Sequence, residues 1–133
     1  MNRILDTNVC IDVLRGRGKV VDRLKNCDPR ECFVSSITEF ELYQGADRAP
    51  DIHRQTEREK VIRFLSCLQK LPFDSECGRI AGEINAKLLN AGTPVSITDV
   101  FIAATGLRHA WVVVTNNTKD FARIEGLALE DWR

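Results

Sequence analysis

The chain has 133 residues, enough for one domain to bury a core without disulfides or metals. Its composition, 44% hydrophobic and 29% charged, is that of a globular protein and excludes disorder over most of the chain. No apolar run approaches the roughly 20 residues that a membrane span needs, and no signal-peptide core follows the N-terminus. We therefore expect a cytoplasmic protein with no membrane contact.

The charge is balanced, with 19 Lys and Arg against 19 Asp and Glu. This excludes a protein that coats nucleic acid through bulk positive charge. An enzyme with acidic residues in its site and basic residues around it would also have a net charge near zero, so the balance does not exclude an enzyme that acts on nucleic acid.

Five cysteines occur without a C-x-x-C pair, and the chain has only two histidines, His53 and His109. This is poor material for a zinc site. We expect reduced and mostly buried thiols at Cys10, Cys27, Cys32, Cys67 and Cys77.

The first half of the chain alternates short apolar runs with helical patterns. In order, we predict a strand at 3–5, a helix from about Thr7 to before Gly16, a short helix at 20–24, a turn at 28–30, a strand at 32–35 and a helix at 36–46. Residues 47–60 are strongly polar, and we expect a solvated loop and the start of a helix there, followed by an apolar helical stripe at 61–68.

The second half continues this alternation. In order, we predict a strand or connector at 71–73, a helix from Asp74 or Ser75 to Gly92, a helix at 100–104 that is buried all round, a strand at 111–115, a turn or helix cap at 116–118 and an edge strand at 127–129. Alternating strands and helices, with one strand apolar on both sides, predict an α/β fold around a parallel sheet.

Acids or carboxamides follow several of these predicted elements. They are Asp6 after the first strand, Glu41 in the helix after the second, Asp99 at the start of the apolar helix, and Asn116, Asn117 and Asp120 after the clearest strand. Ligands of parallel sheets gather beyond the carboxyl ends of the strands, so these side chains are expected at one edge.

Each of these residues alone has an ordinary structural explanation. Asp6 can cap a helix, Asp99 can favour a helix dipole, and Glu41 can lie on a solvated face. Together in one pocket, several carboxylates need a counter-charge. A hard divalent cation held by oxygen ligands, Mg²⁺ or Mn²⁺, supplies it, and such ions act on phosphates.

Four motifs carry a resemblance to a known family. They are Leu5-Asp6-Thr7-Asn8, Ser36-x-Thr38-x-x-Glu41-Leu42-x-x-Gly45, Thr98-Asp99-x-x-Ile102-Ala103-Ala104 and Val114-Thr115-Asn116-Asn117-x-x-Asp120-Phe121. In this order and at these distances they resemble the PIN-domain ribonucleases, specifically the VapC-type toxins of type II toxin–antitoxin pairs. The likeness runs from Leu5 to about Trp132. It implies a single PIN domain over residues 1–133, a three-layer α/β sandwich with a central, mostly parallel sheet flanked by helices.

The resemblance also implies an activity: Mg²⁺-dependent endonucleolytic hydrolysis of RNA, tRNA or rRNA, that inhibits translation. Asp6 and Asp99 match the family's primary metal ligands, and Glu41 matches the acid that binds directly or through water. Mn²⁺ is the expected substitute for Mg²⁺. The expected supporting residues are Thr7, Asn8 and Thr115.

One position departs from the family pattern. PIN domains often carry an Asp after the Thr of the last motif, and this chain has Asn117. Asp120, about one helical turn later, is the other candidate for the fourth position, and a second tightly held metal is left open.

The resemblance further implies partners. A cognate VapB-type antitoxin would lay its C-terminal segment over the site, often with an Arg that reaches the acids, and homodimers are usual. Phe40 and Tyr43 are candidates for either the core or an interface, as are Val61, Phe64 and Leu65.

Positive charge for RNA binding has two possible sources. Arg15 and Arg17 are predicted to flank the acidic pocket and hold the RNA backbone, unless they lie on a merely solvated face. A second basic group comprises Arg48, His53, Arg54 and Arg58.

The sequence also allows two alternative functions to be considered. Asn117 makes a non-catalytic PIN-fold module that only binds RNA or a protein conceivable. A haloacid-dehalogenase-like phosphohydrolase also begins with a strand that ends in Asp, but it needs a second Asp where this chain has Asn8.

Overall fold

The computed structural model describes all 133 residues, as a single sheet with helices packed on it. The strands are β1 (Arg3–Leu5), β2 (Cys32–Ser35), β3 (Gln69–Leu71), β4 (Val112–Val114) and β5 (Leu129–Glu130). The helices are α1 (Thr7–Leu14), α2 (Gly18–Lys25), α3 (Ser36–Asp47), α4 (Asp51–Leu65), α5 (Ser75–Asn90), α6 (Ile97–His109) and α7 (Thr118–Phe121), with a 3-10 turn, η1 (Pro29–Glu31). None of the helices has the length and apolar character that a bilayer crossing requires.

The sheet has the strand order β3-β2-β1-β4-β5, and all neighbouring strands are parallel. β1 lies in the centre, where Ile4 is in register with Phe33 on one side and Val113 on the other. Because all strands run the same way, their carboxyl ends meet at one edge of the sheet.

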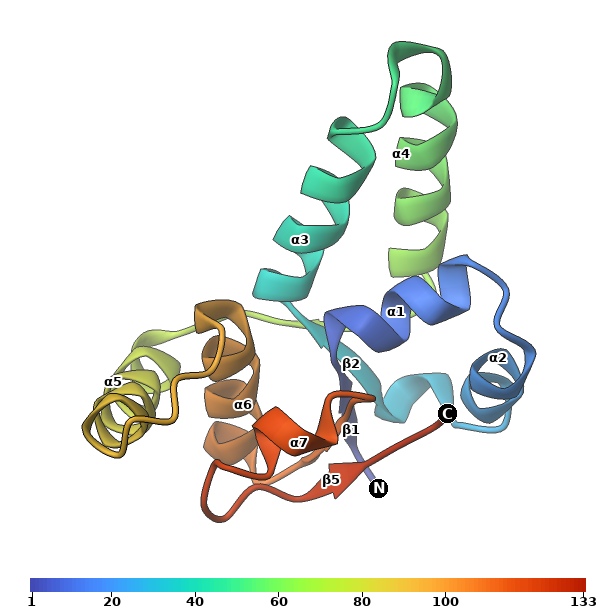
Figure 1. Cartoon of the computed structure of the whole chain (residues 1–133). Coiled ribbons are helices and arrows are strands. Elements are labelled where there is room, and N and C mark those ends of the chain that lie inside the picture. Colours follow the sequence, from blue (N-terminus) through green and yellow to red (C-terminus); the bar gives the residue numbers. More distant parts are fainter.

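Two hydrophobic cores cover the two faces of the sheet. Leu5 and Val114 pack into a core with α1 to α4, whereas Ile4 and Val113 pack into a second core with α5, α6 and α7. Successive side chains of a strand point to opposite faces, so both faces of β1 and β4 are buried. Figure 1 shows α5 and α6 on one side of the strands, with α1 and α2 on the other. This confirms the predicted three-layer α/β sandwich.

Helix α6 lies unusually close to β4. A Cβ atom on Gly106 would lie 2.6 Å from Val113 Cγ2, so only glycine permits this approach. Ile102, Ala103 and Ala104 are fully buried on the same helix. The prediction of a helix buried all round is therefore confirmed.

The segment 47–60 was predicted as a solvated loop and a helix start, and the structure shortens the loop to residues 48–50. Helix α4 begins at Asp51 and runs to Leu65, antiparallel to α3, and Figure 1 shows the two as a hairpin that extends beyond the sheet. Its polar residues form a solvated helix surface with an ion pair between Arg54 and Asp51. A helix that projects into solvent needs only a short apolar stripe, which Val61 and Leu65 supply by packing into the core.

Two strand boundaries also differ from the prediction. β3 ends at Leu71 because Pro72 has no backbone N–H with which to continue the ladder. β5 is displaced to Leu129–Glu130, where Glu130 is in register with Val114. The position of a two-residue edge strand depends on its pairing with the neighbouring strand β4 more than on the apolar pattern of its own residues.

Candidate functional site

Asp6 lies at the carboxyl end of the central strand and is nearly fully buried, with 1% of its surface exposed. Its Oδ1 accepts a hydrogen bond from the backbone N–H of Thr7 at 2.8 Å, so Asp6 is the N-cap of α1. Its Oδ2 accepts from the hydroxyl of Thr115 at 2.8 Å. One carboxylate therefore caps a helix and also joins the ends of β1 and β4.

Glu41 is brought to the same edge by α3, which follows β2. The Thr7 hydroxyl donates to Glu41 Oε1 at 2.7 Å and lies 3.0 Å from the hydroxyl of Thr38. Thr38 is fully buried one helical turn before Glu41. Thr38 stands in the second motif but not among the expected site residues, and its three-residue spacing from Glu41 on one helix face was the signal for it.

Asp99 joins this group from the first turn of α6. Its Oδ2 accepts from the side-chain amide of Asn117 at 3.1 Å, and the same amide donates to Asp120 Oδ2 at 3.1 Å. The backbone N–H of Asn117 donates to the Thr115 hydroxyl at 2.9 Å. Asn117 and Asp120, the two candidates for the fourth site position, thus both lie beside Asp99.

The carboxylates are held close together without a cationic side chain. No salt bridge involves Asp6, Glu41 or Asp99. Burial raises the pKa of Asp6 to about 7, and the charges of Asp99 and Glu41 add to the effect against the opposing hydrogen bonds from Thr115 and Thr7. Burial likewise raises the pKa of Asp99, with the charges of Glu41 and Asp120 contributing. The site therefore favours a bound positive charge.

The remaining predicted residues lie further from this cluster. Asn8 is exposed on the first turn of α1 and is outside the hydrogen-bonded set. Arg15 is exposed beside a groove that Glu41 also lines. Arg17 is half-exposed, and its Nε lies 3.2 Å from the buried carboxylate of Asp12. The structure thus separates these two arginines, of which only Arg15 is without an ion-pair partner.

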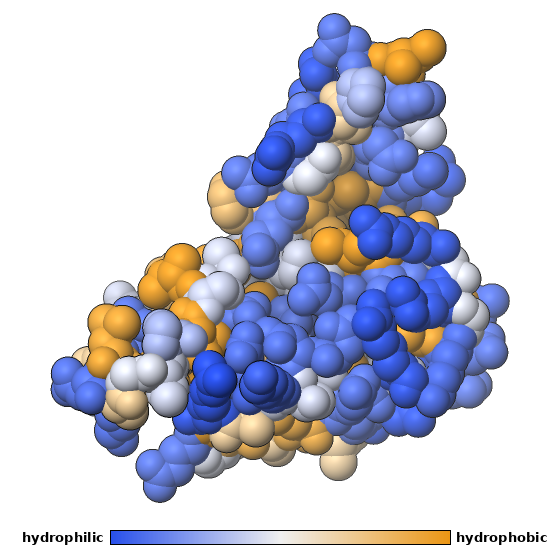
Figure 2. Space-filling view, viewed as in Figure 1, coloured by the Kyte–Doolittle hydropathy of each residue, from blue (hydrophilic) through white to orange (hydrophobic).

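A groove of about 540 Å³ opens beside the site where the α3–α4 hairpin meets α1. Its lining residues are Ile11, Leu14, Arg15, Glu41, Leu42, Gly45, Ala46, Glu57, Lys60 and Val61. Figure 2 shows apolar side chains in the recess between the hairpin and α1, with hydrophilic ones around it. The groove is continuous with the site because Glu41 belongs to both.

The chemistry of the site suits a hard cation, although no three carboxylate, histidine or cysteine side chains are already arranged to hold an ion. Hydrogen bonds from Thr7 and Asn117 engage Glu41 and Asp99 instead. Mg²⁺ usually keeps several waters and is bound by only one or two carboxylates, so it does not need a complete protein cage. The buried carboxylate of Asp6 and the partly exposed carboxylates of Glu41 and Asp99, none of them in a salt bridge, fit such an ion.

The family model of the PIN domain matches residues 3–127. The chain therefore belongs to the PIN-domain family, as its motifs indicate. It is 35% identical over 129 residues to a tRNA(fMet)-specific endonuclease VapC of Salmonella typhimurium, covering 97% of this chain and 96% of that relative.

Solved structures agree with this placement. The crystal structure of DNA-bound VapBC from Salmonella typhimurium is similar with a TM-score of 0.92 and 34% identity, covering 100% of this chain and 99% of that chain. VapBC2 from Rickettsia felis, bound to a promoter DNA fragment, is similar with a TM-score of 0.89 and 29% identity over the full length of both chains.

Proposed function

We propose that this protein is a Mg²⁺-dependent endoribonuclease, the toxin of a VapBC-type pair, which hydrolyses phosphodiester bonds in RNA. The main observation behind this proposal is that one series of hydrogen bonds links acids from separate elements at one edge of the sheet. The series runs Glu41–Thr7–Asp6–Thr115–Asn117–Asp99. The VapC name of the relative at 35% identity supports the same activity, and it makes tRNA the first substrate class to test.

Asp6 and Asp99 would hold the cation, with Glu41 bound directly or through water. The ion would lower the pKa of an attacking water and stabilise charge on the phosphate. The Thr7 hydroxyl orients Glu41, and the Thr115 hydroxyl orients Asp6, so both carboxylates are held before substrate arrives. The amide of Asn117 adds no charge and keeps Asp99 and Asp120 side by side.

The proposal is tested with Asp6→Asn and Asp99→Asn, which remove charge with little change in shape. Each variant is expected to lose cleavage of a tRNA pool in Mg²⁺, and EDTA is expected to abolish cleavage by the unmodified protein. Asp22→Asn, on the exposed surface of α2, is the matched control and should cleave normally. Undiminished cleavage by either site variant contradicts the assignment.

A non-catalytic PIN-fold binding module is the second candidate, and the neutral Asn117 is the observation that favours it. It predicts that the unmodified protein binds RNA in Mg²⁺ and leaves every phosphodiester bond intact. The same cleavage assay therefore separates the two functions.

The groove between the α3–α4 hairpin and α1 is our proposed seat for a VapB-type antitoxin. Its floor includes Ile11, Leu14 and Val61, while Arg15 and Lys60 lie among its charged lining. This combination suits an amphipathic helix, which places apolar anchors in such a groove. A segment bound there would lie beside Glu41 and block the site.

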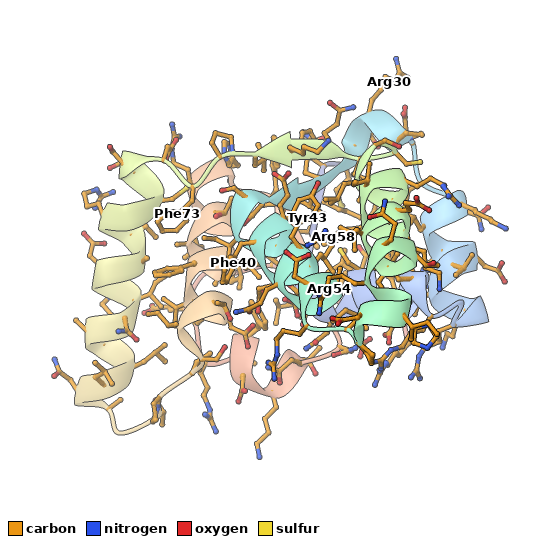
Figure 3. All side chains as sticks on the ribbon, turned by 90° about the horizontal axis from the view of Figure 1, so that it is seen from above. Arg30, Phe40, Tyr43, Arg54, Arg58 and Phe73 are labelled. Carbon is orange, nitrogen blue, oxygen red and sulfur yellow. The ribbon has the colours of Figure 1, made fainter.

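Arg15 remains our proposed contact for the RNA backbone, and Arg17 a weaker one because Asp12 already engages it. A homodimer also belongs to the proposal. Phe40 and Tyr43 project from α3 (Figure 3), with 54% and 38% of their surfaces exposed. Neither aromatic residue belongs to the buried core, which supports the interface interpretation.

A further inference from the structure

Asp12 is a buried carboxylate that the proposed chemistry does not use. It lies on α1, two turns after Asp6, and only 2% of its surface is exposed. The guanidinium of Arg133 donates to both of its oxygens at 3.0 Å, and Arg17 Nε lies 3.2 Å from Oδ1. Asn116 Nδ2 donates to Oδ2 at 3.2 Å.

The two arginines already compensate the charge of Asp12. The bidentate hydrogen bonds from Arg133 hold the pKa of Asp12 below its usual range, so the group is ionised in the fold. Arg133 is itself held in place, because its backbone N–H donates to Asp131 Oδ1 at 3.0 Å. The bond to Asn116 therefore adds a tether to the loop after β4 rather than a needed counter-charge.

Asn116 stands between two residues that contact the site carboxylates. Thr115 donates to Asp6, and Asn117 donates to Asp99 and Asp120. A displacement of Asn116 moves both neighbours because they share its backbone. The loop is otherwise joined to the sheet through Thr115, whose backbone N–H donates to the carbonyl of Glu130 at 3.0 Å.

We propose that Asp12, Arg133 and Asn116 form a positioning network that holds the loop of residues 115–117 in the geometry the site needs. None of these three hydrogen-bonds to Asp6, Glu41 or Asp99, so they would act through Thr115 and Asn117. The inference rests on the proposed nuclease function for its activity readout, but not for its metal-binding and exchange readouts.

The main test is Asn116→Ala, with Asn90→Ala at the exposed end of α5 as the matched control. We expect kcat for RNA cleavage to fall about tenfold or more while KM stays within about twofold, and the affinity for Mn²⁺, measured by electron paramagnetic resonance, to fall by a similar factor. Amide exchange should accelerate over residues 115–121 and stay unchanged in β1. If Asn116 had only a structural role, the variant would unfold at a lower denaturant concentration, but kcat would not fall selectively relative to KM.

Exchanging the side chains of Asp12 and Asn116 tests whether the hydrogen bond between them can be restored. Asn116→Asp alone places two carboxylates together and should be worse than Asn116→Ala. Adding Asp12→Asn restores one amide-to-carboxylate hydrogen bond and should recover part of the Mn²⁺ affinity. Unchanged kcat, Mn²⁺ affinity and exchange in Asn116→Ala overturn the network. Failure of the unmodified protein to cut RNA overturns the proposed function instead, and the Mn²⁺ and exchange measurements still decide the network.

Discussion

At the scale of single residues, the site is built from groups with two structural tasks. Asp6 caps α1 through one oxygen and binds the Thr115 hydroxyl through the other. Neither bond supplies a full positive charge, so the ionised form stays unfavourable at this buried position, and its pKa is raised to about 7. Capping and site function are therefore not alternatives for this residue.

The raised pKa makes the stability of the metal-free protein depend on pH. The folded chain holds the Asp6 proton more tightly than the unfolded chain, with pKa values of about 7 and 3.8. The resulting stabilisation is complete below pH 3.8 and is lost as the pH rises through 7. The difference corresponds to at most about 4 kcal/mol. Urea unfolding in EDTA should thus give a lower unfolding free energy at pH 8 than at pH 5.

Asp6→Asn should flatten this pH dependence, because the substituted amide does not titrate. Asp22→Asn, which removes an exposed carboxyl, should leave the slope as it is. Mg²⁺ at pH 8 should restore stability to the unmodified protein, since it binds the ionised form. Equal slopes in the unmodified protein and Asp6→Asn would contradict the assigned cause.

At the scale of elements, the α3–α4 hairpin serves both the site and the groove. Helix α3 carries Glu41 toward Asp6, and Leu42 on the next position packs into the core with Val61 of α4. Gly45 lines the groove one turn further along, and no atom lies within 4 Å of the position a Cβ would take there. The groove floor at this point is therefore open because the residue is glycine.

Gly45→Trp is expected to fill the groove and leave the fold intact. The apparent affinity of the variant for the cognate antitoxin should fall about 100-fold or more, a hot-spot-sized loss, and the cleavage that the variant shows without antitoxin is its own baseline because Arg15 and Glu41 line the same groove. Gly82→Trp on α5, where the space around the Cβ position is equally open, is the control and should bind normally. Titration of cleavage with antitoxin measures both. Full inhibition of Gly45→Trp would exclude the groove as the binding seat.

At the scale of the whole molecule, the exposed aromatic residues of α3 are the surface that the proposed homodimer would use. Phe40 and Tyr43 flank Glu41 in sequence, yet they face solvent while Glu41 faces the site. Large aromatic side chains anchor protein interfaces because they bury much apolar area at low entropic cost. A dimer through this face would bring two sites near each other.

Sedimentation should show the unmodified protein at twice its monomer mass and the double variant Phe40→Ser, Tyr43→Ser as a monomer. Ile52→Ser, at the start of α4 with 83% of its surface exposed, is the control and should remain dimeric. A double variant that stays dimeric places the interface elsewhere.

The sequence by itself determined the α/β class and predicted Asp6, Glu41 and Asp99 as the candidate acids of the site. These are local signals: a strand that is apolar on both sides, a helix that is buried all round, and acids that directly follow such elements. The point within 47–60 at which the loop ends and the helix begins was not predicted, because a polar run has the same local pattern in a loop as on a solvated helix, and the docking of α4 against α3 decides between them.

The family resemblance named Thr7 and Thr115 as supporting residues, but only the tertiary structure decided which hydrogen bonds join them to the acids. Thr7, Thr115 and Asn117 connect them across separations of up to 109 residues, and such contacts leave no periodic pattern in the chain. The same holds for Asp12, which stands in an apolar helical stretch and finds Arg133 and Asn116 only after β5 has paired with β4. Local propensity determines which residues form helices and strands. Long-range hydrogen bonds and packing determine where the side chains of these elements come together.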